Sequence, residues 1–366
     1  MNKLVHRTAI AACLGIVVLM LSGTAEAQYQ LLNLVSNQVG QAPIIDPLLA
    51  NPWGLARSAT SPWWLSDNDT GWSTIYDGPS GAIVPLKVLV PTAGNGPVSP
   101  TGSNGPGQPT GIVYNASKTD FQVQGSSASF IFATLDGTIS AWAPGVNKNL
   151  ATLAIDNSAN KASYTGLAIT SNASGNFLYA ADNANNKIDM YDGSWNLVQS
   201  FTDTSVPSTM SVFGVQDIDG LLYVTYAVPN VGAGGFVDLF KEDGTFVKTL
   251  VQGTRLNQAW GIAVAPPDFG PLSNTLLISN NSVNGTINGF DPLTGQFVGA
   301  VADQNGKTII LNNLWGIAFG GGTTANGATS TLFVTVGQGI GPNELAGTFA
   351  KIVYNPATPS NAVRPK

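Results

Sequence analysis

Six uncharged polar residues recur along the chain, each three positions before a glycine that is followed by an aliphatic residue. Their amide and hydroxyl groups can hydrogen-bond to the backbone, to water or to a polar ligand, and their oxygens are of the kind that Ca²⁺ accepts. The candidate ligand-binding residues are therefore Asn51, Gln108, Ser163, Ser211, Gln258 and Asn313.

The only cysteine, Cys13, and the only histidine, His6, both lie in the first 27 residues. That segment has a basic leader, an apolar run and an Ala-Glu-Ala sequence at 25–27, a combination typical of a secretory signal peptide. We expect cleavage after Ala27, so that the mature protein begins at Gln28. It is then secreted or periplasmic and has no membrane anchor.

Without residues 1–27 the chain contains neither histidine nor cysteine. This excludes thiol nucleophiles, disulfides, imidazole acid–base catalysis, Ser-His-Asp triads and His/Cys metal sites. The mature chain keeps 13 basic and 20 acidic residues, a net charge of −7, and its basic residues are scattered singly. Such a chain repels phosphate backbones, so we expect no nucleic-acid partner.

The candidate residues belong to a repeat that predicts the elements holding them. Each repeat opens on a glycine-centred segment, continues with a second β-rich run, turns through hairpin signals such as DGT at 136–138 and NGT at 284–286, and ends in a fourth run. Four strands in each unit of about 50 residues describe a propeller blade. The opening segments are NPWGLA, QPTGIV, SYTGLA, SVFGVQ, QAWGIA and NLWGIA.

The predicted fold is an all-β, six-bladed β-propeller of four-stranded antiparallel blades. Inner strands of neighbouring blades approach closely, which explains the glycines, and we expect Trp53, Trp260 and Trp315 to fill the wider wedge where each strand enters. The sixth unit supplies three strands, so YQLLNLVS at 29–36 is expected to close the ring as its fourth. We assign one domain to 28–357, a tail to 358–366 and an inter-blade loop to 91–109.

The opening segments, followed by strands such as FLYAAD at 177–182, resemble NHL-type repeats. More closely, LLNLVSNQVGQAPIIDPLLANPWGLA, AWGIAVAP and LWGIAFG resemble an uncharacterised family of bacterial secreted β-propellers, whose members often end in a PEP-CTERM sorting tail. The resemblance implies a propeller and brings no activity with it. The chain ends without such a tail, so surface sorting by that route is not implied.

Two interpretations of the polar ring remain open. Its side chains cap backbone groups and hold tunnel waters, or they form a ligand or Ca²⁺ site in which Asp46 or Asp217 joins Asn51 and Asn313. The sequence SDNDTGW at 66–72 has an acidic spacing like that of a calcium loop, but position 78 is glycine where an EF-hand needs glutamate. We interpret it as a hairpin turn.

The favoured function is a non-catalytic extracytoplasmic binding module, monomeric, without a cofactor, whose partner is a protein or a glycan. No catalytic residue is assigned. The alternative is a Ca²⁺-dependent hydrolase or lyase that resembles gluconolactonase-like six-bladed propellers, with its site at the tunnel mouth. Acidic ligands at the tunnel are sparse in this sequence.

Overall fold

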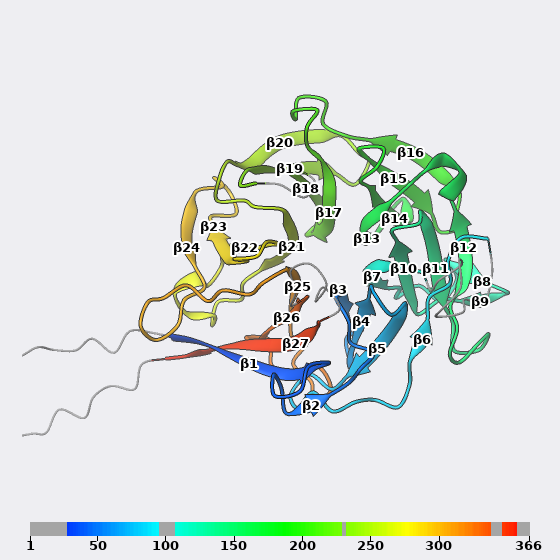
Figure 1. Cartoon of the computed structure of the whole chain (residues 1–366). Helices are drawn as coiled ribbons and strands as arrows, with labels where there is room; N and C mark the ends of the chain where they lie inside the picture. The colour runs from blue at the N-terminus through cyan, green and yellow to red at the C-terminus, as the bar shows by residue number, and fades with distance from the viewer. Residues whose placement is uncertain (1–27, 95–106, 229–231, 338–345, 357–366) are drawn as a thin grey trace, which may run out of the picture.

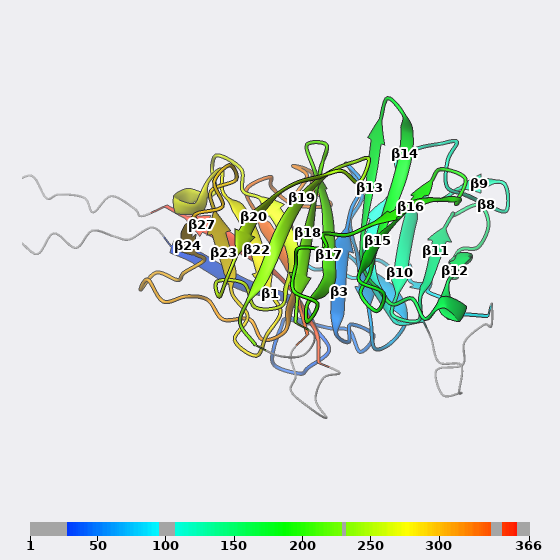
Figure 2. The same ribbon diagram turned by 90° about the horizontal axis from the view of Figure 1, so that it is seen from above.

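The computed structural model describes residues 28–94, 107–228, 232–337 and 346–356. Six sheets stand in a ring around a central axis (Figure 1), so the predicted six-bladed propeller is confirmed. Figure 2 shows the blades from above, standing side by side. The predicted signal peptide, the tail at 358–366 and most of the 91–109 loop lie outside the described residues.

Each blade is numbered by its innermost strand, in chain order. The inner strands are β3 (Pro52–Ala56), β7 (Pro109–Tyr114), β13 (Tyr164–Asn172), β17 (Ser211–Ile218), β21 (Ala259–Val264) and β25 (Leu314–Phe319). The second strands are β4 (Trp63–Asp67), β10 (Phe130–Thr134), β14 (Gly175–Asp182), β18 (Leu221–Ala227), β22 (Leu276–Asn280) and β26 (Leu332–Val336).

The outer half of each blade completes an antiparallel sheet. The third strands are β5 (Trp72–Tyr76), β11 (Thr138–Trp142), β15 (Lys187–Asp192), β19 (Gly235–Lys241), β23 (Ile287–Phe290) and β27 (Thr348–Asn355). The outermost strands are β6 (Val88–Leu89), β12 (Thr152–Asp156), β16 (Leu197–Phe201), β20 (Phe246–Gln252), β24 (Phe297–Ala300) and β1 (Gln28–Ser36).

A few elements depart from the repeat. Strand β2 (Ile44–Ile45) pairs in parallel with β1, and β8 (Gln122–Val123) pairs with β9 (Ser126–Ser127) in an insertion between the first two strands of blade 2. The short 3₁₀ helices are η1 (Ser158–Asn160) and η2 (Gly270–Leu272). In the part of the chain that the structure describes, no helix has the length and apolar character needed to cross a membrane.

The motif glycines lie where inner strands of neighbouring blades meet. A Cβ atom at Gly54 would lie 2.6 Å from Thr110 O, and one at Gly261 would lie 2.8 Å from Trp315 O. Each of these oxygens belongs to the residue just before the glycine of the next blade. The glycines are therefore required by close backbone approach, as predicted, since any side chain would force the blades apart.

Hydroxyl groups from second strands bond the blades together at the same level. Gly261 N donates to Ser279 Oγ (2.8 Å), which donates to Trp315 O of the next blade (2.6 Å). Thr335 Oγ1 likewise accepts from Gly316 N (2.8 Å) and donates to Trp53 O (2.6 Å), across the joint between blades 6 and 1. These contacts fix the inner strands relative to one another and thereby fix the mouth of the tunnel.

Strand β1 closes the ring by pairing antiparallel with β27, as predicted, and Figure 1 shows the blue strand beside the red one. The strand also ties blade 6 to blade 5. Tyr29, 4% exposed, donates its hydroxyl to Phe269 O (2.6 Å) and accepts from Leu272 N (3.0 Å).

A chain without residues 28–36 is expected to aggregate or become protease-sensitive, because β27 then has an open edge and blade 5 loses its contact with Tyr29. Trimming residues 358–366 is expected to leave melting temperature and protease resistance unchanged. Limited proteolysis and size-exclusion chromatography compare the two truncations with the full chain. Equal stability of both would contradict closure by β1.

Candidate functional site

Every inner strand carries a β-bulge at its motif glycine. The pairing register shifts there in all six blades, for example between Pro52 and Leu55 against β4 and between Leu314 and Ile317 against β26. A bulge bends a strand and re-aims a side chain. The re-aimed residue is the one just before the glycine.

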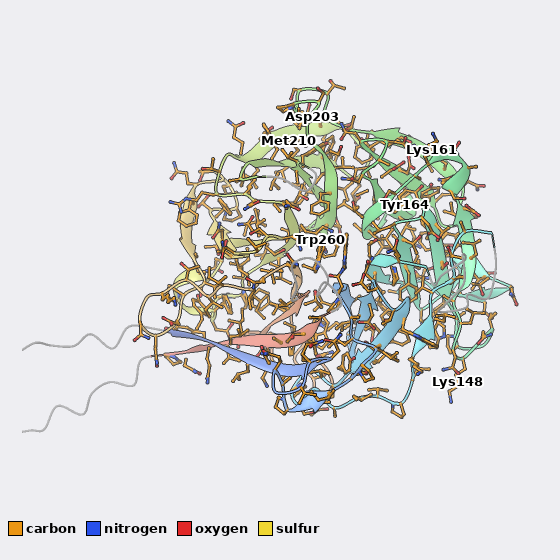
Figure 3. The ribbon with its side chains drawn as sticks, viewed as in Figure 1. Lys148, Lys161, Tyr164, Asp203, Met210 and Trp260 are labelled. Atoms are coloured by element: carbon orange, nitrogen blue, oxygen red, sulfur yellow. The ribbon has the colours of Figure 1, made fainter. Side chains whose placement is uncertain are left out.

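These side chains meet on the axis rather than filling the wedges between blades, so that prediction was wrong. The indoles of Trp53 and Trp315 stack with centroids 3.5 Å apart, and Trp260 stands edge-on to both, at 6.2 and 5.8 Å. Phe213 joins the cluster, and Figure 3 shows Trp260 near the middle of the ring. Below this aromatic cluster, at the level of the motif glycines, lies a void of only about 50 Å³.

Above the aromatic cluster a cavity of about 630 Å³ occupies one mouth of the tunnel, here called the mouth cavity. Small-molecule sites commonly span about 300–1,000 Å³. Four of the six predicted ring residues line the cavity, namely Asn51, Ser163, Gln258 and Asn313, whereas Gln108 and Ser211 are not among its lining residues. The rest of the lining comprises Trp53, Leu135, Thr165, Asn183, Phe213, Ala227, Val228, Gly232, Asn257, Asn281, Ser282, Val283 and Trp315.

Three ring residues have left-handed backbone conformations. The φ angles are 44° at Asn51, 51° at Gln258 and 51° at Asn313. Asparagine tolerates this region better than most residues, which gives a local reason for its presence at two of these positions. The turns that lead the chain into these inner strands thus hold the three residues at the rim of the cavity.

Two asparagines that follow second strands, Asn183 and Asn281, line the mouth cavity and were missed as site residues. Asn68 of blade 1 stands at the same repeat position but outside the mouth cavity. The three asparagines follow SD at 66–67, AD at 181–182 and SN at 279–280, and Asn68 lies in the predicted hairpin turn between β4 and β5. Asn68 and Asn183 donate Nδ2 to carbonyls of the next blade, Pro109 O (3.1 Å) and Val212 O (2.7 Å). Asn281 stands at the equivalent place in blade 5, yet its Nδ2 has no hydrogen-bond partner. The recurrence of asparagine at this repeat position is the sequence signal that could have identified Asn281 as a site residue.

Two further polar atoms of the lining have no partner, Trp53 Nε1 and Asn257 Oδ1. The other two indoles of the cluster are bonded. Trp260 Nε1 donates across the ring to Thr165 O (2.8 Å), and Trp315 Nε1 donates to Asn51 Oδ1 (3.1 Å). An unpaired buried polar group costs about 1–3 kcal/mol and calls for an explanation.

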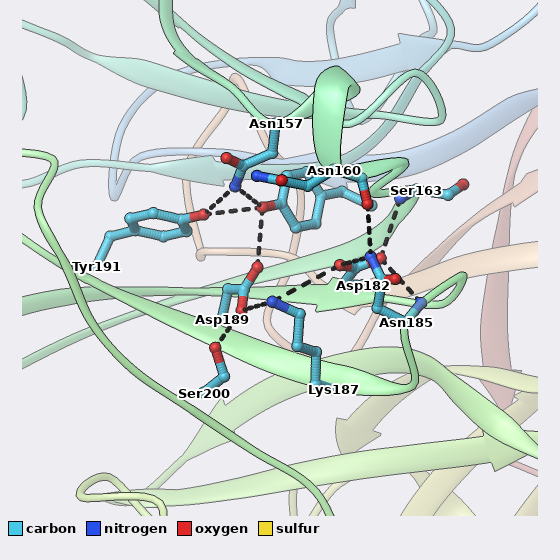
Figure 4. Close-up of polar contacts among 10 residues, drawn as sticks. Asn157, Asn160, Ser163, Asp182, Asn185, Lys187, Asp189, Tyr191 and Ser200 are labelled. Carbon is cyan, nitrogen blue, oxygen red and sulfur yellow. Dashed lines mark hydrogen bonds and ion pairs between the residues drawn. The ribbon is translucent and has the colours of Figure 1, made fainter.

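A buried polar network supports the blade 3 side of the mouth cavity (Figure 4). Asp182 accepts from Ser163 N (3.0 Å) and from Asn185 Nδ2 (2.7 Å), which fixes both the entry to β13 and the turn that carries Asn183. Lys187 bridges outward to Asp189 (2.8 Å). Burial, followed by the neighbouring Tyr191 hydroxyl, raises the pKa of Tyr164 in the same network, so that its hydroxyl stays protonated.

The described residues that line the mouth cavity include no aspartate, glutamate, lysine or arginine. Nowhere in the described ranges do three or more His, Cys, Asp or Glu side chains gather to hold a metal ion. Of the four residues considered for Ca²⁺, Asn51 and Asn313 line the mouth cavity, whereas Asp46 and Asp217 do not. Asp46 lies before β3 and accepts from Tyr76 Oη (3.0 Å) and Leu48 N (2.9 Å), whereas Asp217 lies near the opposite end of β17 from the mouth.

Asp217 instead belongs to an acidic neighbourhood between blades 3 and 4. Desolvation by burial, helped by Glu242 and Asp219, raises the pKa of Asp217 from 3.8 to about 6. This carboxyl is therefore protonated in the folded protein at pH values where an exposed aspartate is charged.

The fold and this site define a six-bladed propeller with an aromatic-floored cavity at one tunnel mouth, and the described residues that line this cavity carry no charge. No family model matches the chain. The chain is 32% identical over 305 residues to uncharacterized protein R648 of Acanthamoeba polyphaga mimivirus, covering 78% of this chain and 72% of R648. The chain belongs to the family of R648.

Uncharacterized protein R640 of the same virus is 33% identical over 225 residues, which cover 56% of this chain and 41% of R640, so the match spans less than half of that relative. Both relatives are viral and give no support to the bacterial PEP-CTERM family that the sequence resembles. Among solved structures, "Streptogramin B lyase structure" superposes with a TM-score of 0.50 at 14% identity, covering 90% of this chain and 98% of that chain. At this identity the likeness concerns the fold alone.

The unpaired indole gives a stability prediction. Trp53→Phe and Trp260→Phe remove the same atoms from one cluster, but only the second loses a hydrogen bond, the one to Thr165 O. We expect Trp260→Phe to lower the free energy of unfolding by about 1 kcal/mol more than Trp53→Phe does. Urea denaturation measures the difference. An equal or larger loss in Trp53→Phe would show that its N–H is bonded in the free protein.

The raised pKa of Asp217 gives a pH prediction. The folded state keeps this proton until about pH 6 and the unfolded state releases it near 3.8, so this group's contribution to stability is present below about pH 4 and is lost as pH rises to about 6. The melting temperature of wild type should therefore fall relative to Asp217→Asn across this window.

The control is Asp243→Asn. Hydrogen bonds from Thr245 lower the pKa of Asp243 below its ordinary 3.8, so its contribution to stability changes only below about pH 4, and the melting temperatures of wild type and Asp243→Asn should stay nearly parallel between pH 4 and 6. If the difference in melting temperature between wild type and Asp217→Asn stays constant from pH 4 to 7, Asp217 is hydrated like a surface carboxylate.

Proposed function

We propose that the chain is a non-catalytic binding propeller that acts outside the cytoplasm, in the periplasm or the extracellular space, and holds an uncharged group of a protein or glycan partner in the mouth cavity. It works as a monomer without a cofactor. The proposed location rests on the signal-like residues 1–27.

The observation that carries this proposal is the chemistry of the lining. A space of about 630 Å³ has an aromatic floor and a rim of amides and hydroxyls, with no acid or base among its described residues. Acid–base catalysis needs a titratable group within hydrogen-bond reach of the reacting atom. Binding needs only shape, apolar surface and a few fixed polar groups.

The sequence-level alternative, a Ca²⁺-dependent hydrolase or lyase, needs hard oxygen ligands, usually with several carboxylates among them. Asn51 and Asn313 supply amide oxygens at the mouth, but Asp46 and Asp217 lie elsewhere. A Ca²⁺-dependent rise in melting temperature that EDTA reverses, together with hydrolysis of a lactone, would support this alternative and overturn the non-catalytic proposal.

A library of small uncharged fragments, soaked into crystals and screened by ligand-observed NMR, tests the binding site. We expect hits to cluster in the mouth cavity and to be lost in Val283→Trp, because Val283 is 47% exposed on the cavity lining and an indole there fills the opening. The matched control is Val298→Trp on β24, at a residue 51% exposed and away from the cavity. Hits that cluster elsewhere, or that survive Val283→Trp, would contradict the proposed site.

A further inference from the structure

Unpaired polar atoms surround the mouth cavity in a particular mixture. Trp53 Nε1 and Asn281 Nδ2 are donors without acceptors, and Asn257 Oδ1 is an acceptor without a donor. All three belong to lining residues and are shielded from open solvent. The two amides end in a soft sp³–sp² torsion, so their orientation can adjust to a ligand.

We propose that the ligand of the mouth cavity is an uncharged saccharide, bound with an apolar ring face over the aromatic cluster and its hydroxyls among the amides. This inference rests on the proposed function and adds the class of ligand. It uses the atoms that the fold leaves without partners.

The described lining residues carry no charge, and this argues against ionic ligands. A phosphate, a carboxylate or a metal ion in this cavity would lose hydration without gaining an opposite charge among the described lining residues. Charged sugars such as uronates are disfavoured for the same reason.

The mixture of donors and acceptors argues for hydroxyls. A hydroxyl group both donates and accepts, so vicinal hydroxyls of one sugar ring can satisfy an Nδ2 and an Oδ1 together. Each hydroxyl of a sugar can serve either an unpaired donor or the unpaired acceptor, whereas in a peptide unit the donor and the acceptor are separate groups with fixed roles. The C–H face of a sugar also matches a floor of Trp53, Trp315 and Phe213, whose rings bury large apolar area.

The site is also preorganised. The left-handed turns at Asn51, Gln258 and Asn313 and the Asp182 network hold the rim in place before a ligand arrives. Less conformational freedom is then lost on binding, which raises affinity. Asn68 and Asn183 donate their amides to the next blade, whereas the equivalent Asn281 does not, so the amide of Asn281 is available to a ligand.

The test is isothermal titration of the full mature chain with maltotriose, cellotriose and triacetylchitotriose. Trigalacturonate, the glucosamine trimer and the blocked tripeptide acetyl-triglycine-amide serve as comparison probes. We expect at least one neutral trisaccharide to bind saturably and to change tryptophan fluorescence. Its charged counterpart should bind at least about tenfold more weakly, a difference of about 1.4 kcal/mol.

Variants then localise the contact. Asn281→Ala and Trp53→Phe should each weaken saccharide binding about tenfold without a matching loss of stability. Asn68→Ala changes the equivalent asparagine of blade 1, which lies outside the mouth cavity and bonds to Pro109 O. It should lower stability and leave saccharide affinity unchanged.

The outcomes separate this inference from the proposed function. If neutral fragments occupy the mouth cavity but no trisaccharide binds, or only a charged sugar or the tripeptide binds, the saccharide inference is overturned and the binding site stands. If neither fragments nor saccharides occupy the cavity, both proposals fall. Binding that Asn68→Ala weakens as much as Asn281→Ala does would also overturn the saccharide contact, because it would report general loosening of the blades.

Discussion

The structure depends on how closely six inner strands approach one axis. At that distance a Cβ atom on Gly54 or Gly316 would lie within 3 Å of a carbonyl oxygen of the next blade. The glycines permit the approach, and hydroxyls such as Ser279 Oγ and Thr335 Oγ1 then bond one blade to the next. Every blade obeys the same constraint, and β1 completes the last sheet by pairing with β27.

The same crowding produces the site. Each inner strand bulges at its glycine, and the bulge directs the preceding side chain to the axis. Blades 4, 5, 6 and 1 place Phe213, Trp260, Trp315 and Trp53 there, whereas blades 2 and 3 have the smaller Thr110 and Thr165 at the equivalent positions. The aromatic cluster occupies the axis above the glycine level, so the space at this mouth becomes a pocket with an apolar floor.

Two residues of the mouth cavity differ in their hydrogen bonding from the equivalent residues of other blades. Asn68 and Asn183 bond to the next blade, whereas Asn281 does not. Trp260 and Trp315 have acceptors, whereas Trp53 has none. Both exceptions lie on the mouth cavity. A saccharide in that cavity would supply hydrogen-bond acceptors to Trp53 Nε1 and Asn281 Nδ2.

The sequence by itself determined the architecture. Glycines at intervals of 47 to 57 residues, second strands such as 63–67 and the missing strand at 29–36 follow from local periodicity and from packing rules that act in every blade alike. It also identified four lining residues, because the polar column precedes the same turn in each repeat.

Only the tertiary structure decided where side chains from different blades meet. Trp53 and Trp315 lie 262 positions apart in the chain, yet they stack because two bulges aim them at one point. Sequence spacing could not show that Asp46 and Asp217 lie away from the mouth, since each belongs to a different level of its blade. Nor could it show that Asn281 lacks a partner, since that depends on the exact distance to the neighbouring blade. Repeats encode strands locally, but a site on the axis is a product of all six blades, and its geometry exists only when the ring is closed.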